Sequence, residues 1–295
     1  MSRPNVLQVG RFPARFNERL QRDYQLIRLW EQPDVLAERG ADIDIVVTSA
    51  RYGCSAEQLA QMPNLKAICS FGVGYDSIAV DDAKARGIVI STTPDVLNEC
   101  VADTAIGLVI DTARQFAASD RHVRQGKWLN GQYPLTRKVS GKKLGIVGFG
   151  RIGKDIAKRA AGFDMEIRYH KRREDPDSGY RFEANLKALA TWADFLVLAC
   201  PGGAATHHLI DAEILAALGA DGILVNIARG SVVDEQALVA ALQAGTLGGA
   251  GLDVFEDEPR VPEALFDMPN VVLLPHVGSA TEETRLAMEL SLIHI

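Results

Sequence analysis

The sequence predicts an α/β protein built from two doubly wound parallel-sheet lobes. Short apolar runs alternate with longer segments of helical period, which is typical of a parallel sheet with helices on its faces. The chain has 295 residues, enough for about two domains. Hydrophobic residues make up 47% of it and charged residues 24%, which excludes a disordered or collagen-like chain.

The first series of strands and helices occupies the N-terminal third of the chain. Apolar runs bounded by turn residues predict strands at 6–9, 43–48, 65–70 and 88–91. The longer stretches at 56–62 and 78–86 suit helices between those strands. The series ends near Thr93-Pro94-Asp95, where proline interrupts regular structure.

A long helical pattern follows, from about residue 98 to residue 126. Val101, Ala105, Leu108 and Ala113 recur on its helical period. We expect this helix to connect two sheets and to contribute to a subunit contact, although a plain core helix fits the pattern as well. A second series then predicts strands at 143–147, 166–169, 195–199, 223–226, 248–252 and 271–274.

A glycine-rich turn follows the first strand of the second series and predicts a dinucleotide site. Its residues form the pattern G-x-G-x-x-G and are Gly148, Phe149, Gly150, Arg151, Ile152 and Gly153. Gly148 would allow the tight turn, Gly150 would let the pyrophosphate approach the backbone, and Gly153 would let the helix pack on the strand. The phosphates would bind the unpaired N–H groups at the helix N-terminus. A glycine-rich turn without a ligand is the alternative.

The end of the next strand predicts which cofactor binds. An NAD enzyme would carry an acidic residue about 20 positions after the first glycine. Here the strand ends instead in Lys171, Arg172 and Arg173 after His170. A 2′-phosphate carries about two negative charges, and arginine matches its oxygens well. The sequence therefore predicts NADP(H) in preference to NAD(H), with a solvated basic turn as the alternative.

Five segments resemble a known family in combination. They are NIARGSVVDE at 226–235, GLDVFEDEP at 251–259, LPHVGS at 274–279, FGVGYD at 71–76 and VADTA at 101–105. Together they resemble the D-isomer-specific 2-hydroxyacid dehydrogenases. The basic strand end and Ala199-Cys200-Pro201 look most like the glyoxylate, hydroxypyruvate and hydroxyphenylpyruvate reductase branch.

The resemblance implies a flavodoxin-like substrate lobe and a Rossmann cofactor lobe with a cleft between them. The expected bounds are 1–100 for the substrate-binding lobe and 101–277 for the NAD(P)-binding lobe. Residues 278–295 are expected to return to the substrate lobe. After Met288 the chain reads ELSLIHI and stops, where similar enzymes continue, so this last segment is expected to be shortened and to pack less.

Three residues can supply the chemistry that 2-keto acid reduction needs. Arg229 can hold the substrate carboxylate as a bidentate fork. His276 can donate a proton to the ketone oxygen. Glu258 can pair with His276 and stabilise its protonated form. Arg229 and His276 each follow a strand end, the expected ligand edge of such a sheet, and all three match the catalytic residues of the family.

Other site residues are implied by the resemblance alone. Backbone N–H groups of Val73 and Gly74 would hold the substrate carboxylate together with Arg229 and His276. Asp253 would accept a hydrogen bond from the nicotinamide carboxamide, with a turn cap as its alternative role. The remaining expected cofactor contacts are Thr104, Cys200, Pro201, Ile227 and Ala228.

The remaining histidines and the cysteines carry no motif. His122, His170, His207 and His208 are expected to be structural or surface residues. Cys54, Cys69, Cys100 and Cys200 form no C-x-x-C and no nucleophile pattern. We therefore expect free thiols, a reducing cytoplasmic compartment and no metal ion.

Charge and hydropathy limit the partners that we expect. The net charge is −6 with no long basic block, which argues against nucleic acid. No apolar run reaches 18 residues, which argues against a membrane span. The expected partners are a small 2-keto acid and a second copy of the chain in a homodimer.

Two alternative functions remain open from the sequence. One is a dinucleotide-sensing interaction protein similar to the C-terminal-binding corepressors, which also resemble this family. The other is a reductase for a larger 2-keto acid, such as 2-ketogluconate or hydroxyphenylpyruvate. The main hypothesis is an NADPH-dependent reductase of glyoxylate or hydroxypyruvate that forms the D-2-hydroxy acid.

Overall fold

The computed structural model describes residues 3–293 and divides into two compact units. One unit holds the residues up to Leu97 together with those from Thr281 onward, and the other is Asn98–Ala280. The expected substrate lobe, 1–100, runs three residues past the first boundary, and the expected cofactor lobe ends three residues before the second. Residues 1–2 and 294–295 of the expected lobes lie outside the described residues.

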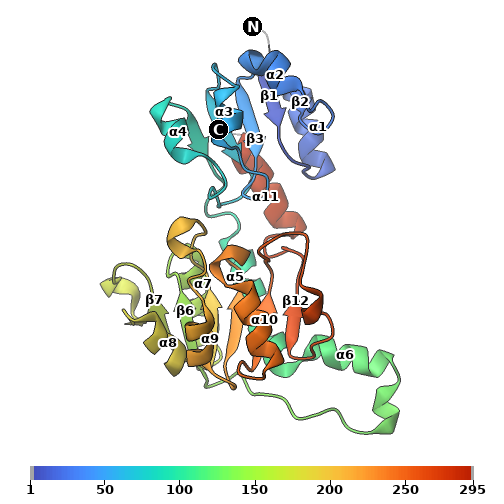
Figure 1. Cartoon of the computed structure of the whole chain (residues 1–295), viewed down its shortest axis with the longest axis vertical. Helices are drawn as coiled ribbons and strands as arrows, with labels where there is room; N and C mark the ends of the chain where they lie inside the picture. Colours follow the sequence, from blue (N-terminus) through green and yellow to red (C-terminus); the bar gives the residue numbers. More distant parts are fainter. Residues whose placement is uncertain (1–2, 294–295) are drawn as a thin grey trace. The chain divides into compact units, whose positions relative to one another are not determined.

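The first unit is built on a five-stranded sheet in the order β2-β1-β3-β4-β5, in which every neighbouring pair is parallel. This is the flavodoxin-like order 2-1-3-4-5. Its elements, shown in Figure 1, are β1 (Asn5–Gln8), α1 (Ala14–Asp23), β2 (Gln25–Arg28), α2 (Val35–Arg39), β3 (Ile45–Thr48), α3 (Ala56–Ala60), β4 (Ala67–Ser70), α4 (Val80–Ala85), β5 (Val89–Ser91) and α11 (Glu282–Ile293).

The core of the first unit explains why these short segments are ordered. Val46 and Ile68 on the central strands are fully buried, and Leu59 of α3 packs into the same cluster. The C-terminal helix α11 belongs to this unit as well. Its Leu292 is buried, and the guanidinium of Arg285 lies 5.7 Å from the ring of Phe71, the residue after β4.

The second unit is built on a seven-stranded sheet in the order β12-β11-β10-β9-β6-β7-β8, again parallel throughout. Its elements are α5 (Asn98–Arg114), α6 (Phe116–Arg124), β6 (Lys143–Val147), α7 (Arg151–Ala161), β7 (Glu166–His170), β8 (Arg181–Phe182), α8 (Leu186–Trp192), β9 (Phe195–Leu198), α9 (Ala212–Leu218), β10 (Ile223–Asn226), α10 (Glu235–Gln243), β11 (Gly249–Leu252) and β12 (Val271–Leu273).

The strand order of the second unit is that of a Rossmann fold. The chain begins in the middle at β6, moves outward to β8, and then returns to continue from β9 to β12. The order therefore reverses between β6 and β9, which is where such sheets bind dinucleotides. All residues of β9 and β10 are buried, as expected for central strands covered on both faces. The α/β class with two doubly wound parallel sheets is confirmed.

The prediction of one continuous helix over 98–126 is wrong. The helix ends at Arg114, and α6 begins after Gln115, whose φ of +52° lies in the left-handed region. The backbone N–H of Ala117 donates to Oδ1 of Asp111 at 2.9 Å, which satisfies one of the unpaired amides at the start of α6. Figure 1 shows α6 and the segment after it reaching away from the sheet of their unit.

Several elements were not predicted from the sequence. The strands β2 and β8 lie at the edges of their sheets. Both are short and contain an arginine, so neither forms a clear apolar run in the sequence. Short 3₁₀ turns complete the chain at η1 (Gly40–Asp42), η2 (Lys127–Asn130), η3 (Pro176–Ser178), η4 (Ala204–Thr206), η5 (Gly230–Val232) and η6 (Glu263–Leu265). Among the described residues, none of the helices has the length and apolar character needed to cross a bilayer.

Candidate active site

The predicted site loops of the second unit gather at one edge of its sheet. Gly148 follows β6, Lys171 follows β7, Cys200 lies just beyond β9, Asp253 follows β11 and His276 lies three residues after β12. Because all seven strands are parallel, their carboxyl ends share one edge, which is the ligand edge of this fold.

The glycine-rich turn has the geometry that its three glycines require. Gly148 adopts φ +93°, and a Cβ there would collide with the backbone of Cys200. A Cβ on Gly153 would collide with the carbonyl oxygen of Gly148, so only glycine lets α7 pack this closely. Around Gly150, by contrast, nothing lies within 4 Å of a Cβ position.

This open space fits a dinucleotide pyrophosphate at the start of α7. Gly150 is the N-cap and has no capping side chain, so the first-turn N–H groups of Ile152 and Gly153 have no intrahelical acceptor. An anion at this end also interacts favourably with the helix dipole. The ring of Phe149 is buried and stacks on the ring of Tyr169, with the two ring centres 4.2 Å apart. The Phe149 side chain therefore packs in the core beneath the turn.

Tyr169, which was not among the site residues predicted from the sequence, holds the basic segment after β7. The hydroxyl of Tyr169 donates to the carbonyl oxygen of Asp175 at 3.0 Å and accepts from its N–H at 2.9 Å. The Asp175 carboxylate lies 2.8 Å from Nζ of Lys154 and 3.9 Å from Nζ of Lys171. The hydrogen bond from Lys154 lowers the pKa of Asp175, and the pKa of Lys154 is raised in return.

The carboxylate of Asp175 therefore faces two lysines, while Arg172 and Arg173 are exposed. Within residues 3–293, neither of these arginines forms an ion pair. Lys171, Arg172 and Arg173 carry three positive charges against the two negative charges of Glu174 and Asp175, so the end of β7 still presents a surplus of positive charge. This surplus is suited to a phosphate group.

Glu258 and His276 form a hydrogen-bonded pair. Nδ1 of His276 lies 2.8 Å from Oε2 and 3.0 Å from Oε1 of Glu258. The backbone N–H of Phe255 donates to Oε1 at 3.3 Å and orients the carboxylate. The His276 side chain is 40% exposed and that of Glu258 is 18% exposed, so the imidazole can be reached while its partner is mostly covered.

Asp253 fixes the backbone on which His276 sits. It is 2% exposed, and its two carboxylate oxygens accept the N–H groups of Val277 at 2.7 Å and Gly278 at 2.8 Å. Burial raises the pKa of Asp253, and these two hydrogen bonds oppose the rise. The bonds form the turn cap that was the alternative role for this residue, and they stabilise the left-handed φ of +56° at His276.

Arg229 lies on a loop that is shaped by Asn226 and packed against the loop carrying Glu258. The Asn226 side chain accepts the N–H of Ala228 at 3.0 Å and donates to the carbonyl oxygen of Arg229 at 2.8 Å. The next residue, Gly230, meets the Phe255 backbone so closely that a Cβ would collide with it. The half-buried Arg229 and the pair formed by Glu258 and His276 thus lie on adjoining loops.

The remaining predicted residues are distributed over both units. Thr104 on α5 donates to the carbonyl oxygen of Gly278 at 3.3 Å, which puts it beside the turn after His276. Ile227 and Ala228 are buried, whereas Pro201 is exposed. Val73 and Gly74 belong to the first unit. There, Oγ of Ser70 donates to the carbonyl oxygen of Gly74 at 2.9 Å.

The four cysteines are free thiols, as expected. Burial raises the pKa of Cys54, Cys69 and Cys200 to about 11. A thiol with so high a pKa is a poor nucleophile near neutral pH, because the thiolate is the reactive form. Cys200 therefore suits a packing role beside the glycine-rich turn.

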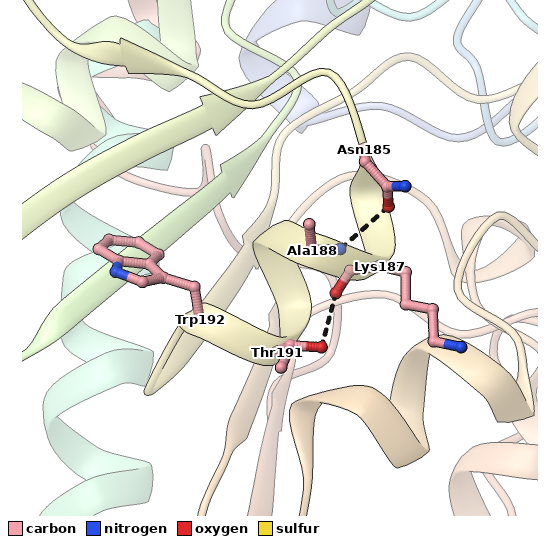
Figure 2. A pocket seen from close by; sticks show the side chains of 5 residues that line it. All are labelled: Asn185, Lys187, Ala188, Thr191 and Trp192. Atoms are coloured by element: carbon pink, nitrogen blue, oxygen red, sulfur yellow. Dashed lines mark hydrogen bonds between the residues drawn. The ribbon is translucent and has the colours of Figure 1, made fainter.

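A shallow hollow of about 410 Å³ lies elsewhere in the second unit, on α8 (Figure 2). Its dashed hydrogen bonds are local, since Asn185 caps Ala188 at 3.0 Å and Thr191 donates to the carbonyl oxygen of Lys187 at 2.9 Å. These bonds belong to the helix itself, and none of the predicted site residues lines the hollow. It is not the active-site candidate.

Fold and glycine-rich turn together define a dinucleotide-binding protein. The family model described as D-isomer specific 2-hydroxyacid dehydrogenase, NAD binding domain, matches residues 106–278. The chain belongs to the D-isomer-specific 2-hydroxyacid dehydrogenases and is an oxidoreductase with an NAD-binding domain. The resemblance predicted from the sequence motifs is confirmed.

Curated relatives and solved structures agree with this family. Glyoxylate/hydroxypyruvate reductase A of Arabidopsis thaliana is 47% identical over 96% of this chain and 91% of its own length. Hydroxyphenylpyruvate reductase of Plectranthus scutellarioides is 45% identical over the same shares. A structure of NADPH-dependent glyoxylate/hydroxypyruvate reductase from Sinorhizobium meliloti with NADP and malonate is 43% identical. It has a TM-score of 0.92 and covers 99% of this chain and 92% of that one.

Proposed function

We propose that this chain reduces a small 2-keto acid of the glyoxylate or hydroxypyruvate kind to the D-2-hydroxy acid, with NADPH as cofactor and His276 as proton donor. The observation that carries the proposal is the hydrogen-bonded pair of His276 and Glu258, whose Nδ1 and Oε2 atoms lie 2.8 Å apart. The loop that carries Glu258 packs against the Arg229 loop where Gly230 meets the backbone of Phe255. The names of the relatives support the substrate class. Hydroxyphenylpyruvate and 2-ketogluconate are the larger substrates to compare.

Each residue has a distinct task in this proposal. When bound, the nicotinamide cofactor supplies the hydride. Arg229 orients the substrate by gripping its carboxylate with a planar fork. Protonated His276 donates from its Nε2 to the ketone oxygen, because Nδ1 is engaged with Glu258. The Glu258 carboxylate balances the imidazolium charge and holds the ring in orientation.

The first unit is proposed to contribute the substrate lobe. The backbone N–H groups of Val73 and Gly74 would bind the substrate carboxylate there. This assignment rests on the family pattern and on the position of both residues in the loop after β4, at the carboxyl edge of the first sheet.

A steady-state assay tests the substrate and the reaction class together. NADPH oxidation should be fast with glyoxylate or hydroxypyruvate and slower with hydroxyphenylpyruvate and 2-ketogluconate. A higher kcat/KM for either larger keto acid would move the assignment to that substrate. If all four keto acids were inert while NADPH still bound, the reductase proposal would fail.

Cofactor preference is expected to depend on Arg172 and Arg173. Replacing both with alanine should raise KM for NADPH about 10- to 100-fold, since two charge-assisted hydrogen bonds to the 2′-phosphate are lost. KM for NADH should change little, because NADH has no 2′-phosphate. Lys158→Ala, an exposed charge in the last turn of α7, is the control. Equal effects on both cofactors would contradict the assignment.

A homodimer is proposed from the apolar surface of α6 and the segment after it. None of the residues of α6, all of which the structure describes, is buried. Five of the eleven exposed large hydrophobic residues in the described chain lie here: Phe116, Val123, Trp128, Leu129 and Leu135. An exposed apolar patch of this kind marks a contact surface, and two-fold pairing is the commonest arrangement.

Removing that apolar surface should therefore separate the subunits. Light scattering at micromolar concentration should report a dimer for the native chain and a monomer for Leu129→Asp/Leu135→Asp. Both leucines are more than 90% exposed, so the substitutions should leave the fold of the subunit intact. Phe266→Asp, on an exposed residue outside this surface, should remain dimeric. A native monomer would refute the proposal.

A further inference from the structure

Two histidines and a glutamate outside the proposed active site form a compact cluster in the second unit. Nε2 of His208 lies 2.8 Å from Oε1 of Glu256, and the ring centres of His207 and His208 are 4.0 Å apart. One ligand atom from each of the three residues lies within 4.8 Å of the other two. Glu256 lies 48 residues after His208 in the sequence, so the cluster exists only in the folded chain.

The loop that carries the histidines is fixed by the backbone around it. The N–H of His208 donates to the carbonyl oxygen of Ser231 at 2.8 Å, and the N–H of Ile210 donates to that of Val232 at 3.0 Å. On the other side, Oγ1 of Thr206 donates to the carbonyl oxygen of Pro201 at 2.7 Å. These bonds hold the histidines over η5 before any ligand arrives.

The loop that carries Glu256 is fixed on the same segment. Its N–H donates to Oε1 of Glu235, the first residue of α10, at 3.2 Å. The close contact between Gly230 and the backbone of Phe255 also holds this loop against residue 230. Both ligand-bearing loops are therefore anchored to residues 230–235, so their separation is set by the fold, as a preorganised site requires.

We propose that His207, His208 and Glu256 bind a divalent transition-metal ion such as Zn²⁺. Imidazole nitrogen and carboxylate oxygen are ordinary zinc ligands at about 2.0–2.2 Å, which puts tetrahedral ligand atoms about 3.4 Å apart. The ligand atoms of the three residues now lie within 4.8 Å of one another, so each pair must approach by about 1.4 Å at most to reach that spacing. The partly exposed side chains have room to make this movement. A fourth position stays open to water. The second carboxylate at Glu235 partly balances the ion's charge.

The bound ion would join the histidine loop to the loop that continues to Glu258. This role is structural and separate from the reduction, because neither His207 nor His208 belongs to the proposed catalytic pair. The proposal departs from the sequence-based expectation that no metal is bound. That expectation rested on local spacing, and two adjacent histidines show no metal spacing without Glu256.

Calorimetric titration of the full, untagged and chelator-treated chain with ZnCl₂ tests the proposal. One equivalent should bind, and His207→Gln or Glu256→Gln should each weaken the association at least about 10-fold. His276→Gln is the matched control, because it removes the other histidine that pairs with a glutamate. It should keep the native affinity. Circular dichroism checks that each variant folds, and exposure of the His207 and Glu256 side chains makes folding the expected result.

Thermal unfolding and cobalt spectroscopy give independent readouts. Zn²⁺ should raise the unfolding midpoint of the native chain and of His276→Gln, but not that of Glu256→Gln. Co²⁺ in the native chain should show ligand-field bands of a nitrogen and oxygen site without thiolate charge transfer. Absence of one-to-one binding, an equal loss in His276→Gln, or a thiolate signature from the cysteines would each overturn the proposal.

Discussion

His276→Ala should slow 2-keto acid reduction by about 10²–10⁴-fold, the usual contribution of a positioned general acid. The loss should appear in kcat, because the substitution removes the proposed proton donor rather than a proposed cofactor contact. The NADPH dissociation constant, measured by fluorescence titration, should stay within a few-fold of the native value. His276 is 40% exposed at its side chain, so its truncation leaves no large buried cavity.

His122→Ala is the control for this measurement. His122 lies on α6 with its ring against Tyr133, and no proposed catalytic or cofactor residue touches it there. It should retain native kcat. A His276→Ala enzyme that kept most of its activity would show that the ketone oxygen takes its proton from another source, such as water.

Glu258→Gln tests whether Glu258 acts on His276 through its negative charge or only packs beside it. Glutamine keeps a hydrogen-bond acceptor for Nδ1 of His276 but removes the negative charge that would balance the imidazolium. Glu258→Gln should therefore lower kcat about 10-fold or more, while the NADPH dissociation constant stays within a few-fold of the native value. A native kcat in Glu258→Gln would assign Glu258 to the turn beside Pro259.

Arg229→Lys should reduce kcat/KM on the order of 10²-fold or more, although the positive charge is retained. Lysine offers a point charge in place of the planar fork, so the carboxylate loses its bidentate grip and the ketone loses its orientation toward His276. The NADPH affinity should change little. Stopped-flow measurement of NADPH oxidation at subsaturating keto acid checks the effect.

Arg260→Lys makes the same chemical change two residues after Glu258. Arg260 pairs with Asp257 at 2.7 Å on the surface, where solvent screens an ion pair of this kind. Its activity should be native. If Arg229→Lys behaved like Arg260→Lys, Arg229 would not be the residue that holds the substrate.

Features that depend on neighbouring residues could be predicted from the sequence. The glycine-rich turn is an example, because its three glycines fall within six residues and each meets a local requirement of the strand-turn-helix unit. The central strands were also predictable, since β9 and β10 are buried on both faces and read as continuous apolar runs. Their ends moved by one residue at most.

Features that depend on distant contacts could not be predicted. Asp175 looks like a surface acid until Tyr169 and Lys154 enclose it, and Lys154 lies 21 residues earlier. The helix break at Gln115 carries no glycine or proline signal. Asp253 was selected through the family resemblance as a nicotinamide contact. The sequence did not show that it binds the N–H groups of Val277 and Gly278, which lie 24 and 25 residues later and hold the turn beside His276.

The tight contact at Gly230 has a consequence for how variants of this enzyme are interpreted. Any side chain there must displace the backbone of Phe255 and Glu256, and the displacement passes along the loop to Glu258. An inactivating substitution at Gly230 would therefore mimic the loss of a catalytic group without touching the substrate. A genetic screen would group it with substitutions of active-site residues. Only the structure shows that the defect comes from a steric clash with the backbone of Phe255 and Glu256.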